Sequence, residues 1–399
     1  QRALPVEAWD LVRENFRRAG GGPAAQVAVT ESVRPLPPLP GLVHQEWPMG
    51  EKQVATTAVG KLVVQLGQSD PKFLVTNADG NEASGIANIN QGLKVIHPTV
   101  DPLYNQSPQG QVYEPLSEDA CAGLAAAVCL LGGRSLWCSY ESFAINGLPI
   151  WQTVTQAMAE LRRPTPSTVA LFTAGALEQG RNGWTHQRPE IEAYYMALMR
   201  NGNVYPLFPP DAHCAQAAYL WAVTTSNKGI AIFASKTPLP IRTTWTQAQQ
   251  AVTQGAIVLQ ETPGNPLVVL AVVGDMVLIP VLVAAAQLNA QGLGTRVVSL
   301  VNLRRLYRPT DIAWSTCAEP DGDFMDESTF QGLFGGDALL GISGGPVCTL
   351  EPVLLRARVS RRDAVGWRRG ETAASPDQLL AYNDLSAEAI VQRVRQLLT

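Results

Sequence analysis

Short apolar runs alternate with longer amphipathic segments from about residue 50 to residue 234. The short runs indicate buried strands, and segments with apolar residues three or four positions apart indicate helices. The expected helices are residues 53–68, 118–131, 143–161, 190–200 and 211–223. The expected strands are residues 72–76, 135–139, 168–174, 204–208 and 229–234. This alternation predicts βα units and a mostly parallel sheet.

A second alternation follows a weak break at residues 237–255. Its expected elements are strands at 267–273, 296–300 and 338–342 and helices at 277–290 and 386–398. Asn383 and Asp384, just before Ser386, favour the start of the last helix, because Asn and Asp side chains can cap a helix N-terminus. We expect an extended segment over residues 1–50 and two doubly wound α/β domains with mostly parallel sheets, over residues 51–245 and 246–399.

The N-terminal segment and one apolar stretch need separate interpretation. Residues 35–40 read PLPPLP, and proline fixes φ and supplies no backbone donor, so a linker that lies on another surface is expected there. Residues 267–288 are almost wholly apolar but contain Asp275, and a charge inside a bilayer costs about 3 kcal/mol. A buried strand, a turn and a buried helix explain that stretch better than a membrane span. Because the chain begins at Gln1 rather than Met, we expect it to be part of a longer protein.

The composition of the 399 residues fits a large globular core. Hydrophobic residues make up 46% and charged residues 16%, which argues against disorder. The formal net charge is −4 and there is no long run of Lys and Arg, which argues against a nucleic-acid surface. The six cysteines form no CxxC pair and the four histidines are scattered. We therefore expect buried free thiols in the cytoplasm and no zinc site.

Six strings along the chain carry a family resemblance, namely LSEDACAG at 116–123, CSYESF at 138–143, QGRNGWTHQ at 179–187, FPPDA at 208–212, SKTP at 235–238 and NDL at 383–385. In sequence and in order these strings resemble those of the phosphoketolase family. The corresponding family strings include LSEHQCEG, CYE(A/S)F, QDHNGF(S/T)HQ, LPPDA and GKQP. The resemblance implies a pyrimidine-binding domain over residues 51–245 and a C-terminal domain over 246–399, both of the transketolase type.

The resemblance also implies a reaction and a cofactor. Such enzymes use thiamine diphosphate and Mg²⁺ to cleave xylulose 5-phosphate or fructose 6-phosphate with inorganic phosphate, giving acetyl phosphate and an aldose phosphate. The Gly-Asp-Gly motif that holds the diphosphate and the metal is absent, since Gly274-Asp275 continues with Met276. We therefore expect a homo-oligomer, at least a dimer, or a partner chain that supplies the diphosphate-binding domain. We expect no nucleic-acid or membrane partner.

The family match assigns cofactor binding to Glu118, Tyr140 and Phe143, and catalysis to Glu118 and His186. The Glu118 carboxyl would bond the aminopyrimidine ring and promote loss of the thiazolium proton, and Phe143 would stack on the ring with Tyr140 nearby. His186 would bind the substrate and move protons near neutral pH. Each residue also has a structural interpretation: an acid in a first helical turn, core aromatics, and a loop hydrogen-bonder.

Substrate binding is assigned by the same resemblance to Gln179, Arg181, Asn182 and Lys236. The amides would bond sugar hydroxyls and Lys236 would meet the sugar phosphate, although a solvated surface lysine is the alternative. Gly180-Arg181 stands where the family has Asp-His, and an arginine cannot act as a general base. Two other functions stay open: a degenerate, non-catalytic scaffold or regulatory subunit, and a transketolase or 2-oxoacid dehydrogenase β-type subunit.

Overall fold

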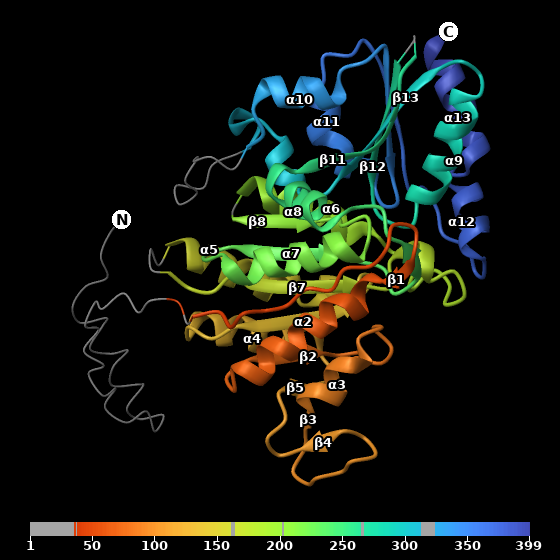
Figure 1. Cartoon of the computed structure of the whole chain (residues 1–399). Coiled ribbons are helices and arrows are strands. Elements are labelled where there is room, and N and C mark those ends of the chain that lie inside the picture. Colours follow the sequence, from red (N-terminus) through yellow and green to blue (C-terminus); the bar gives the residue numbers. More distant parts are fainter. Residues whose placement is uncertain (1–35, 37, 161–163, 202, 265–266, 313–323) are drawn as a thin grey trace, which may run out of the picture. The chain divides into compact units, whose positions relative to one another are not determined.

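The computed structural model describes residues 36, 38–160, 164–201, 203–264, 267–312 and 324–399. The chain divides into two compact units, Gln1–Pro35 and Leu36–Thr399. All of the structure below belongs to the second unit. This unit contains two large sheets, one built before residue 240 and the other after residue 255 (Figure 1).

The first sheet has eight parallel strands in the order β4-β3-β5-β2-β6-β7-β9-β8. The strands are β2 (Leu74–Asn77), β3 (Val95–Ile96), β4 (Gln106–Ser107), β5 (Val112–Tyr113), β6 (Ser135–Tyr140), β7 (Thr168–Thr173), β8 (Val204–Leu207) and β9 (Gly229–Phe233). The helices of this part are α2 (Ala55–Ser69), α3 (Ala87–Leu93), α4 (Glu118–Leu130), α5 (Leu148–Glu160), α6 (Glu190–Asn201) and α7 (Ala212–Thr224). Leu136 and Leu171 pack with α2 and α7, whereas Trp137 and Phe172 pack with α4, α5 and α6. Burial on both faces explains why these strands read as continuous apolar runs.

The second sheet has five strands in the order β11-β13-β12-β14-β15, with β11 antiparallel to β13 and the other pairs parallel. The strands are β11 (Ala256–Thr262), β12 (Leu267–Val273), β13 (Gly294–Leu300), β14 (Ala338–Ser343) and β15 (Arg361–Val365). The helices of this part are α8 (Trp245–Gln254), α9 (Leu278–Asn289), α10 (Glu327–Phe334), α11 (Glu351–Arg356), α12 (Pro376–Tyr382) and α13 (Ala387–Leu398). Val268 packs with α9 and α13, while Val269 joins the core that contains Trp137 and Phe172. This shared core packs the two sheets against each other.

Each strand and helix predicted from the sequence has a counterpart, and the α/β class with mostly parallel sheets is confirmed. One start is wrong: the helix expected from residue 143 begins at Leu148, after a 3₁₀ turn over Ala144–Asn146. Gly147 packs so tightly there that a Cβ would lie 2.7 Å from the Trp137 ring. The weak break at 237–255 contains β10 (Pro238–Pro240), which pairs with β1 (Lys52–Val54), and also α8. The sequence misses α8 because this helix buries few side chains, namely Ala248, Ala251 and Val252.

The apolar stretch at 267–288 forms β12, a turn and most of α9, as predicted. Gly274 makes the turn with φ of 97°, a left-handed conformation that favours glycine. Across the part of the chain that is described, no helix has the length and apolarity needed to cross a membrane. The described cysteines are free thiols, four of them buried and Cys348 half-buried, and Cys317 lies outside the described residues.

Residues 38–50 run as an extended segment over α2 and α7 of the same chain. The backbone N–H of Trp47 donates to Nε2 of His213 at 2.9 Å, and Nε2 of Gln216 donates to the Gln45 carbonyl at 2.8 Å. Nε2 of Gln65 likewise donates to the Val43 carbonyl at 2.9 Å. The expected linker therefore lies on its own chain over this range, and residues 1–35 and 37 lie outside the described residues. The division at residues 50 and 245 stays a prediction.

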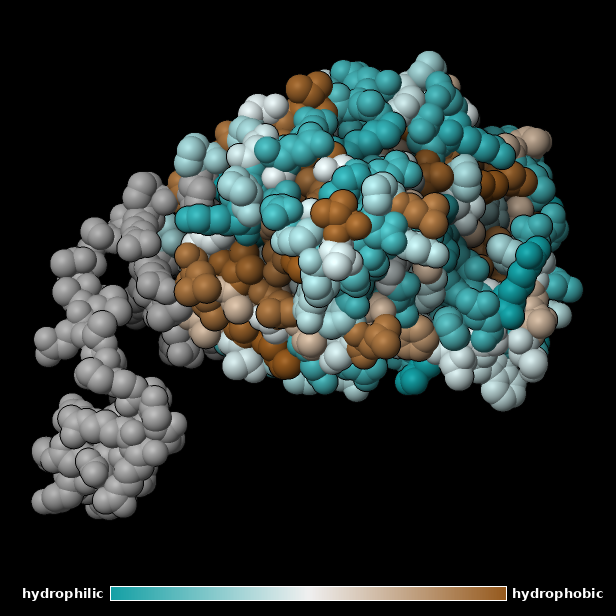
Figure 2. Space-filling model, turned by 90° about the horizontal axis from the view of Figure 1, so that it is seen from below, coloured by the Kyte–Doolittle hydropathy of each residue, from teal (hydrophilic) through white to brown (hydrophobic). Residues whose placement is uncertain are grey.

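Apolar side chains are exposed along α4 and at the start of α5. Leu131 is 86% exposed, and Leu124 and Ile150 are each 38% exposed. After Asp119, α4 carries no charged residue. Figure 2 shows hydrophobic surface gathered on the side of the molecule where these two helices lie. Uncovered apolar area of this kind marks a surface for association.

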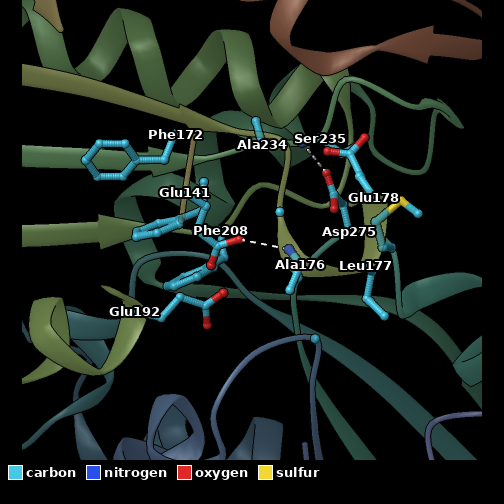
Figure 3. A pocket seen from close by; sticks show the side chains of 15 residues that line it. Glu141, Phe172, Ala176, Leu177, Glu178, Glu192, Phe208, Ala234, Ser235 and Asp275 are labelled. Carbon is cyan, nitrogen blue, oxygen red and sulfur yellow. Dashed lines mark hydrogen bonds between the residues drawn. The ribbon is translucent and has the colours of Figure 1, made fainter. Parts of the chain in front are cut away.

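The seam between the two sheets contains a cavity lined by four carboxyl groups, those of the buried Glu141 and Glu192 and of the half-buried Glu178 and Asp275 (Figure 3). Glu141 follows β6, Glu178 lies in the 3₁₀ turn Ala176–Glu178, Glu192 lies in the first turn of α6, and Asp275 follows β12. The backbone N–H of Ser235 donates to Oδ2 of Asp275 at 2.9 Å, which links the end of β9 to the second sheet. We call this space the acid-lined cavity.

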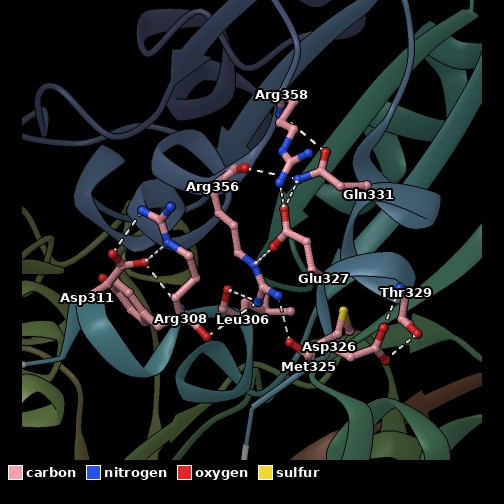
Figure 4. Close-up of polar contacts among 11 residues, drawn as sticks. Leu306, Arg308, Asp311, Met325, Asp326, Glu327, Thr329, Gln331, Arg356 and Arg358 are labelled. Atoms are coloured by element: carbon pink, nitrogen blue, oxygen red, sulfur yellow. Dashed lines mark hydrogen bonds and ion pairs between the residues drawn. The ribbon is translucent and has the colours of Figure 1, made fainter.

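Arg356 connects irregular segments around α10. Its side chain is buried and donates to the carbonyl oxygens of Leu306 at 3.1 Å and Met325 at 2.7 Å, and to Oε2 of Glu327 at 3.1 Å (Figure 4). A planar guanidinium has five N–H donors, so one arginine can donate hydrogen bonds to acceptors on three segments at once.

Asp211 ties the start of α7 to the connection that leads into the second sheet. It is 1% exposed, and its Oδ1 accepts the N–H of Cys214 at 2.9 Å as the N-cap of the helix. Its Oδ2 accepts the backbone N–H groups of Arg242 and Thr243, each at 2.7 Å. Hydrogen bonds to a buried carboxylate are among the stronger ones in proteins.

We predict that Asp211→Ala lowers the free energy of unfolding by about 3 kcal/mol, because it removes a helix cap and leaves buried N–H groups without acceptors. Urea denaturation measures this difference. Asp377→Ala, which removes an exposed carboxylate from the first turn of α12, is the matched control and should change stability by no more than about 0.5 kcal/mol. Equal effects of the two substitutions would contradict the role given to Asp211.

Candidate functional site

The candidate residues follow neighbouring parallel strands at the carboxyl edge of the first sheet. The segments after β2, β6, β7 and β9 carry Asp79, Phe143, His186 and Lys236, and Tyr140 is the last residue of β6. Strands β2, β6, β7 and β9 are adjacent in the sheet. The carboxyl ends of neighbouring parallel strands are where α/β folds bind ligands.

Glu118 is a buried carboxyl at the start of α4. Ser117 caps the helix, with its Oγ accepting the N–H of Ala120 at 3.3 Å. The Glu118 carboxyl is 8% exposed and accepts Oγ–H of Ser139 at 2.7 Å and Nε1–H of Trp137 at 3.2 Å. Burial raises its pKa to about 7, because desolvation outweighs the two hydrogen bonds that lower it. The carboxyl group therefore changes protonation near neutral pH.

Tyr140, Phe143 and His186 form an aromatic wall beside this carboxyl. The rings of Phe143 and His186 meet edge-on with centroids 4.9 Å apart, and those of Tyr140 and Phe143 are nearly parallel at 6.1 Å. Nδ1 of His186 lies 2.8 Å from Oγ1 of Thr185. Ser139 connects the wall to the acid, since its hydroxyl lies within hydrogen-bonding distance of both the Glu118 carboxyl and the Tyr140 carbonyl.

Lys236 closes the other side of the aromatic wall. Its Nζ lies 4.6 Å from the centre of the Tyr140 ring and donates to the Ala83 carbonyl at 2.9 Å. It also lies 3.3 Å from the Tyr140 hydroxyl, which itself donates to the Ala83 carbonyl at 3.1 Å. The ammonium is thus held in place, and it is not a freely solvated surface charge.

Asp79 is a further site residue, which no motif in the sequence marks. Burial raises its pKa, while the backbone N–H of Tyr140 and the charges of His186 and Lys236 lower it. Its Oδ2 is buried without a hydrogen-bond partner among the described residues. Asp79 lies in a stretch, residues 77–85, with only a loose likeness to the family, so no single string marked it.

The other predicted residues lie in the loop between β7 and α6. Gln179 is 2% exposed, and its Oε1 accepts Nδ2–H of Asn182 at 2.5 Å, whereas Arg181 and Asn182 are exposed. Gly180 packs against the second sheet's loop, where a Cβ would lie 2.0 Å from the Ala374 carbonyl oxygen. An aspartate would not fit at position 180 without a shift of this loop.

Comparison with known proteins finds similarity to one family. The family model described as D-xylulose 5-phosphate/D-fructose 6-phosphate phosphoketolase matches residues 59–224. A probable phosphoketolase of Bifidobacterium animalis subsp. lactis is 26% identical over 74% of this chain and 36% of its own length. A probable phosphoketolase of Bradyrhizobium diazoefficiens is 26% identical over 100% of this chain and 51% of its own length. The chain thus spans about half, or less, of the length of these relatives.

Solved structures share the fold. A transketolase of Campylobacter jejuni aligns with a TM-score of 0.67 and 17% identity over 98% of this chain and 54% of its own. A split gene transketolase, described as an inactive beta4 tetramer, aligns with a TM-score of 0.60 and 20% identity over 87% of this chain and 99% of its own. At these identities the likeness shows the transketolase-type fold alone.

The family match covers α2 to α7 and therefore includes Glu118, the aromatic wall and the loop that carries His186. The curated relatives extend the similarity to the second sheet at low identity. The chain is therefore similar to phosphoketolases as a divergent relative, and the similarity corresponds to about half, or less, of the length of those proteins.

Proposed function

We propose that this chain supplies the pyrimidine-binding half of a thiamine diphosphate site in a phosphoketolase, a carbon–carbon lyase. The whole protein would cleave xylulose 5-phosphate or fructose 6-phosphate with inorganic phosphate to acetyl phosphate and an aldose phosphate. One observation carries the proposal: a buried carboxyl, Glu118, lies beside an aromatic wall and has a pKa of about 7. Such a group can take up and release a proton at neutral pH.

The residues present fit the pyrimidine part of the cofactor. Glu118 would hold a proton at a ring nitrogen, and the faces of Phe143 and Tyr140 would stack against a flat ring. The buried Oδ2 of Asp79 adds an acceptor that has no partner among the described residues. When bound, thiamine diphosphate supplies the nucleophilic carbon that attacks the ketose carbonyl.

For the sugar phosphate, the proposal assigns roles along the same edge. Nζ of Lys236 contacts the Ala83 carbonyl and the Tyr140 hydroxyl, which leaves one of its three N–H donors for an anion. His186 would exchange protons with the substrate, and the exposed Arg181 and Asn182 would meet its phosphate or hydroxyls. Gln179 would act indirectly, by holding Asn182.

A second chain or domain would hold the diphosphate and its Mg²⁺. Among the described residues, no group of three or more His, Cys, Asp or Glu side chains could hold a metal ion. The exposed apolar side chains Leu124, Leu131 and Ile150 on α4 and the start of α5 support association with another copy of this chain or with a diphosphate-binding domain.

A second candidate function is a non-catalytic subunit. The split gene transketolase that aligns over 99% of its length is described as an inactive tetramer. An arginine in place of the family's loop histidine also favours this alternative, since Arg181 cannot exchange protons. A transketolase or 2-oxoacid dehydrogenase activity is disfavoured by the phosphoketolase strings at 116–123 and 179–187.

Acetyl phosphate formation by the native, unfragmented protein tests the proposal. With either sugar phosphate, inorganic phosphate, thiamine diphosphate and Mg²⁺, we predict turnover that Glu118→Gln lowers by about 10² to 10³-fold, since the variant cannot transfer a proton. Glu388→Gln, an exposed site on α13, is the control and should leave turnover unchanged. Absence of product with no cofactor bound would favour the non-catalytic subunit.

The raised pKa of Glu118 predicts a pH-dependent effect on stability. Its pKa is about 7 in the folded chain against an ordinary value of 4.5, so the parent chain loses stability as pH rises from 4.5 through 7. Between pH 5 and pH 8 the free energy of unfolding of Glu118→Gln should gain about 2–3 kcal/mol relative to the parent. Urea denaturation at both pH values measures this gain, and a pH-independent difference would contradict the raised pKa.

Residues 1–399 alone should bind thiamine diphosphate weakly. One stacking face and a few hydrogen bonds contribute about 1 kcal/mol each, so we predict a dissociation constant above about 100 µM by isothermal titration. Micromolar binding by the isolated chain would contradict the division of the site between two parts.

A further inference from the structure

The acid-lined cavity is separate from the candidate site, since none of the residues assigned above to that site lines it. Its lining residues are nonetheless sequence neighbours of site residues. Glu141 follows Tyr140, Glu178 precedes Gln179, and Ser235 precedes Lys236. The cavity therefore contacts the segments that position the aromatic wall, the His186 loop and the lysine.

Its carboxyl groups come in two pairs (Figure 3). Glu141 and Glu192 point toward one another, and Glu178 lies beside Asp275 from the second sheet. Glu141 and Glu192 are 5% and 8% exposed. A Cβ on Gly345 would lie 2.0 Å from Oε2 of Glu192, so the loop after β14 encloses that carboxyl.

Three of these carboxyl groups have an oxygen that lacks a partner outside the cluster. Oε1 of Glu141, Oε2 of Glu178 and Oε2 of Glu192 are buried and accept no hydrogen bond from an amide, hydroxyl or cationic group of the described residues, and the Glu141 and Glu192 carboxyl groups hydrogen-bond to one another. Their other contacts leave these atoms available: Glu141 Oε2 accepts the N–H of Ala176 at 3.2 Å, and Glu178 Oε1 accepts Oγ1–H of Thr237 at 2.6 Å. A buried polar atom left unpaired costs free energy comparable to a lost hydrogen bond.

The acids of the cluster disfavour one another's ionisation. Burial and the charge of Asp275 raise the pKa of Glu178 to about 7, although the hydrogen bond from Thr237 and the charge of Lys236 lower it. Burial also raises the pKa of Glu192 well above its ordinary value, and Glu141, Cys348 and Asp275 raise it further. A cation placed among these groups would remove this cost.

We infer that the acid-lined cavity binds a guanidinium group. Its acceptor oxygens come from three elements, and a guanidinium presents five N–H donors in one plane. The lining also offers aromatic faces: the rings of Phe208 and Phe233 are parallel at 4.7 Å, and Phe172 is tilted at 5.3 Å from Phe233. A metal ion fits poorly, because within the described ranges no group of three ligating side chains could hold one.

Binding is coupled to protonation. The carboxyl groups of Glu141 and Glu178 have a pKa of about 7, so below pH 7 a guanidinium must displace protons from the cluster. The occupied cavity would join Glu178 and Glu192 of the first sheet to Asp275 of the second. It would thereby stabilise the segments that carry His186 and Lys236.

Isothermal titration of residues 1–399 with methylguanidinium chloride tests the inference, at pH 6 and pH 8 and constant ionic strength. We expect saturable binding that is about tenfold tighter at pH 8 than at pH 6 and tighter than that of methylammonium. At pH 7, titrations in phosphate and in Tris should differ in heat by the amount that proton release requires.

Two variants of equal charge change make the test specific. Glu178→Gln/Glu192→Gln should weaken binding at least about tenfold, because it removes two of the carboxylates. Glu46→Gln/Glu388→Gln, which changes two exposed carboxylates, should leave it unchanged. No saturable binding by the parent chain, binding without proton release, or equal effects of the two double variants would overturn the inference. The measurement of proton release uses the parent chain, so it tests the inference even if Glu178→Gln/Glu192→Gln does not fold.

Discussion

The burial of carboxyl groups at the carboxyl edge of a parallel sheet is the constraint on which this structure depends. Parallel strands bring their carboxyl ends together, so acids that follow different strands lie close to one another. Glu118 tolerates burial because Ser139 and Trp137 donate to it, yet its pKa still rises to about 7. The result is a group that can exchange a proton at neutral pH, next to an aromatic wall.

The second sheet holds the segments that carry the site residues in place. Its β12 shares an apolar core with the first sheet, and Asp275 accepts the N–H of Ser235 immediately before Lys236. The loop that carries His186 is fixed in the same way, since Gly180 accepts the N–H of Ala374 at 2.9 Å and packs closely against that residue. The family has Asp-His where this chain has Gly180-Arg181. Glycine at position 180 is explained by this close packing, and arginine at position 181 replaces a titratable histidine by a permanent positive charge.

Hydrophobic periodicity predicted the main strands and helices, because both faces of the central strands are buried and their apolar runs are continuous. It missed elements that bury few side chains, such as α8, and strands β3 to β5, which have two residues each and show no period. The family strings predicted five site residues that lie close together in the structure: Glu118, Tyr140, Phe143, His186 and Lys236. Asp79 and Glu192 could not be found, because their burial arises only when segments distant in sequence pack together. The role of Gln179 in binding substrate hydroxyls stays a prediction: its side chain is buried, and its Oε1 accepts Nδ2–H of Asn182.

The central claim is that Glu118 is a desolvated carboxyl poised to exchange a proton near neutral pH. Infrared titration of the carboxyl band, taken as the difference between the parent chain and Glu118→Gln, measures this directly. We predict a midpoint near pH 7, which is the pKa of the buried Glu118 carboxyl. A midpoint near the ordinary value of 4.5 would mean that the carboxyl is solvated, and it would remove the main support for a pyrimidine-binding site.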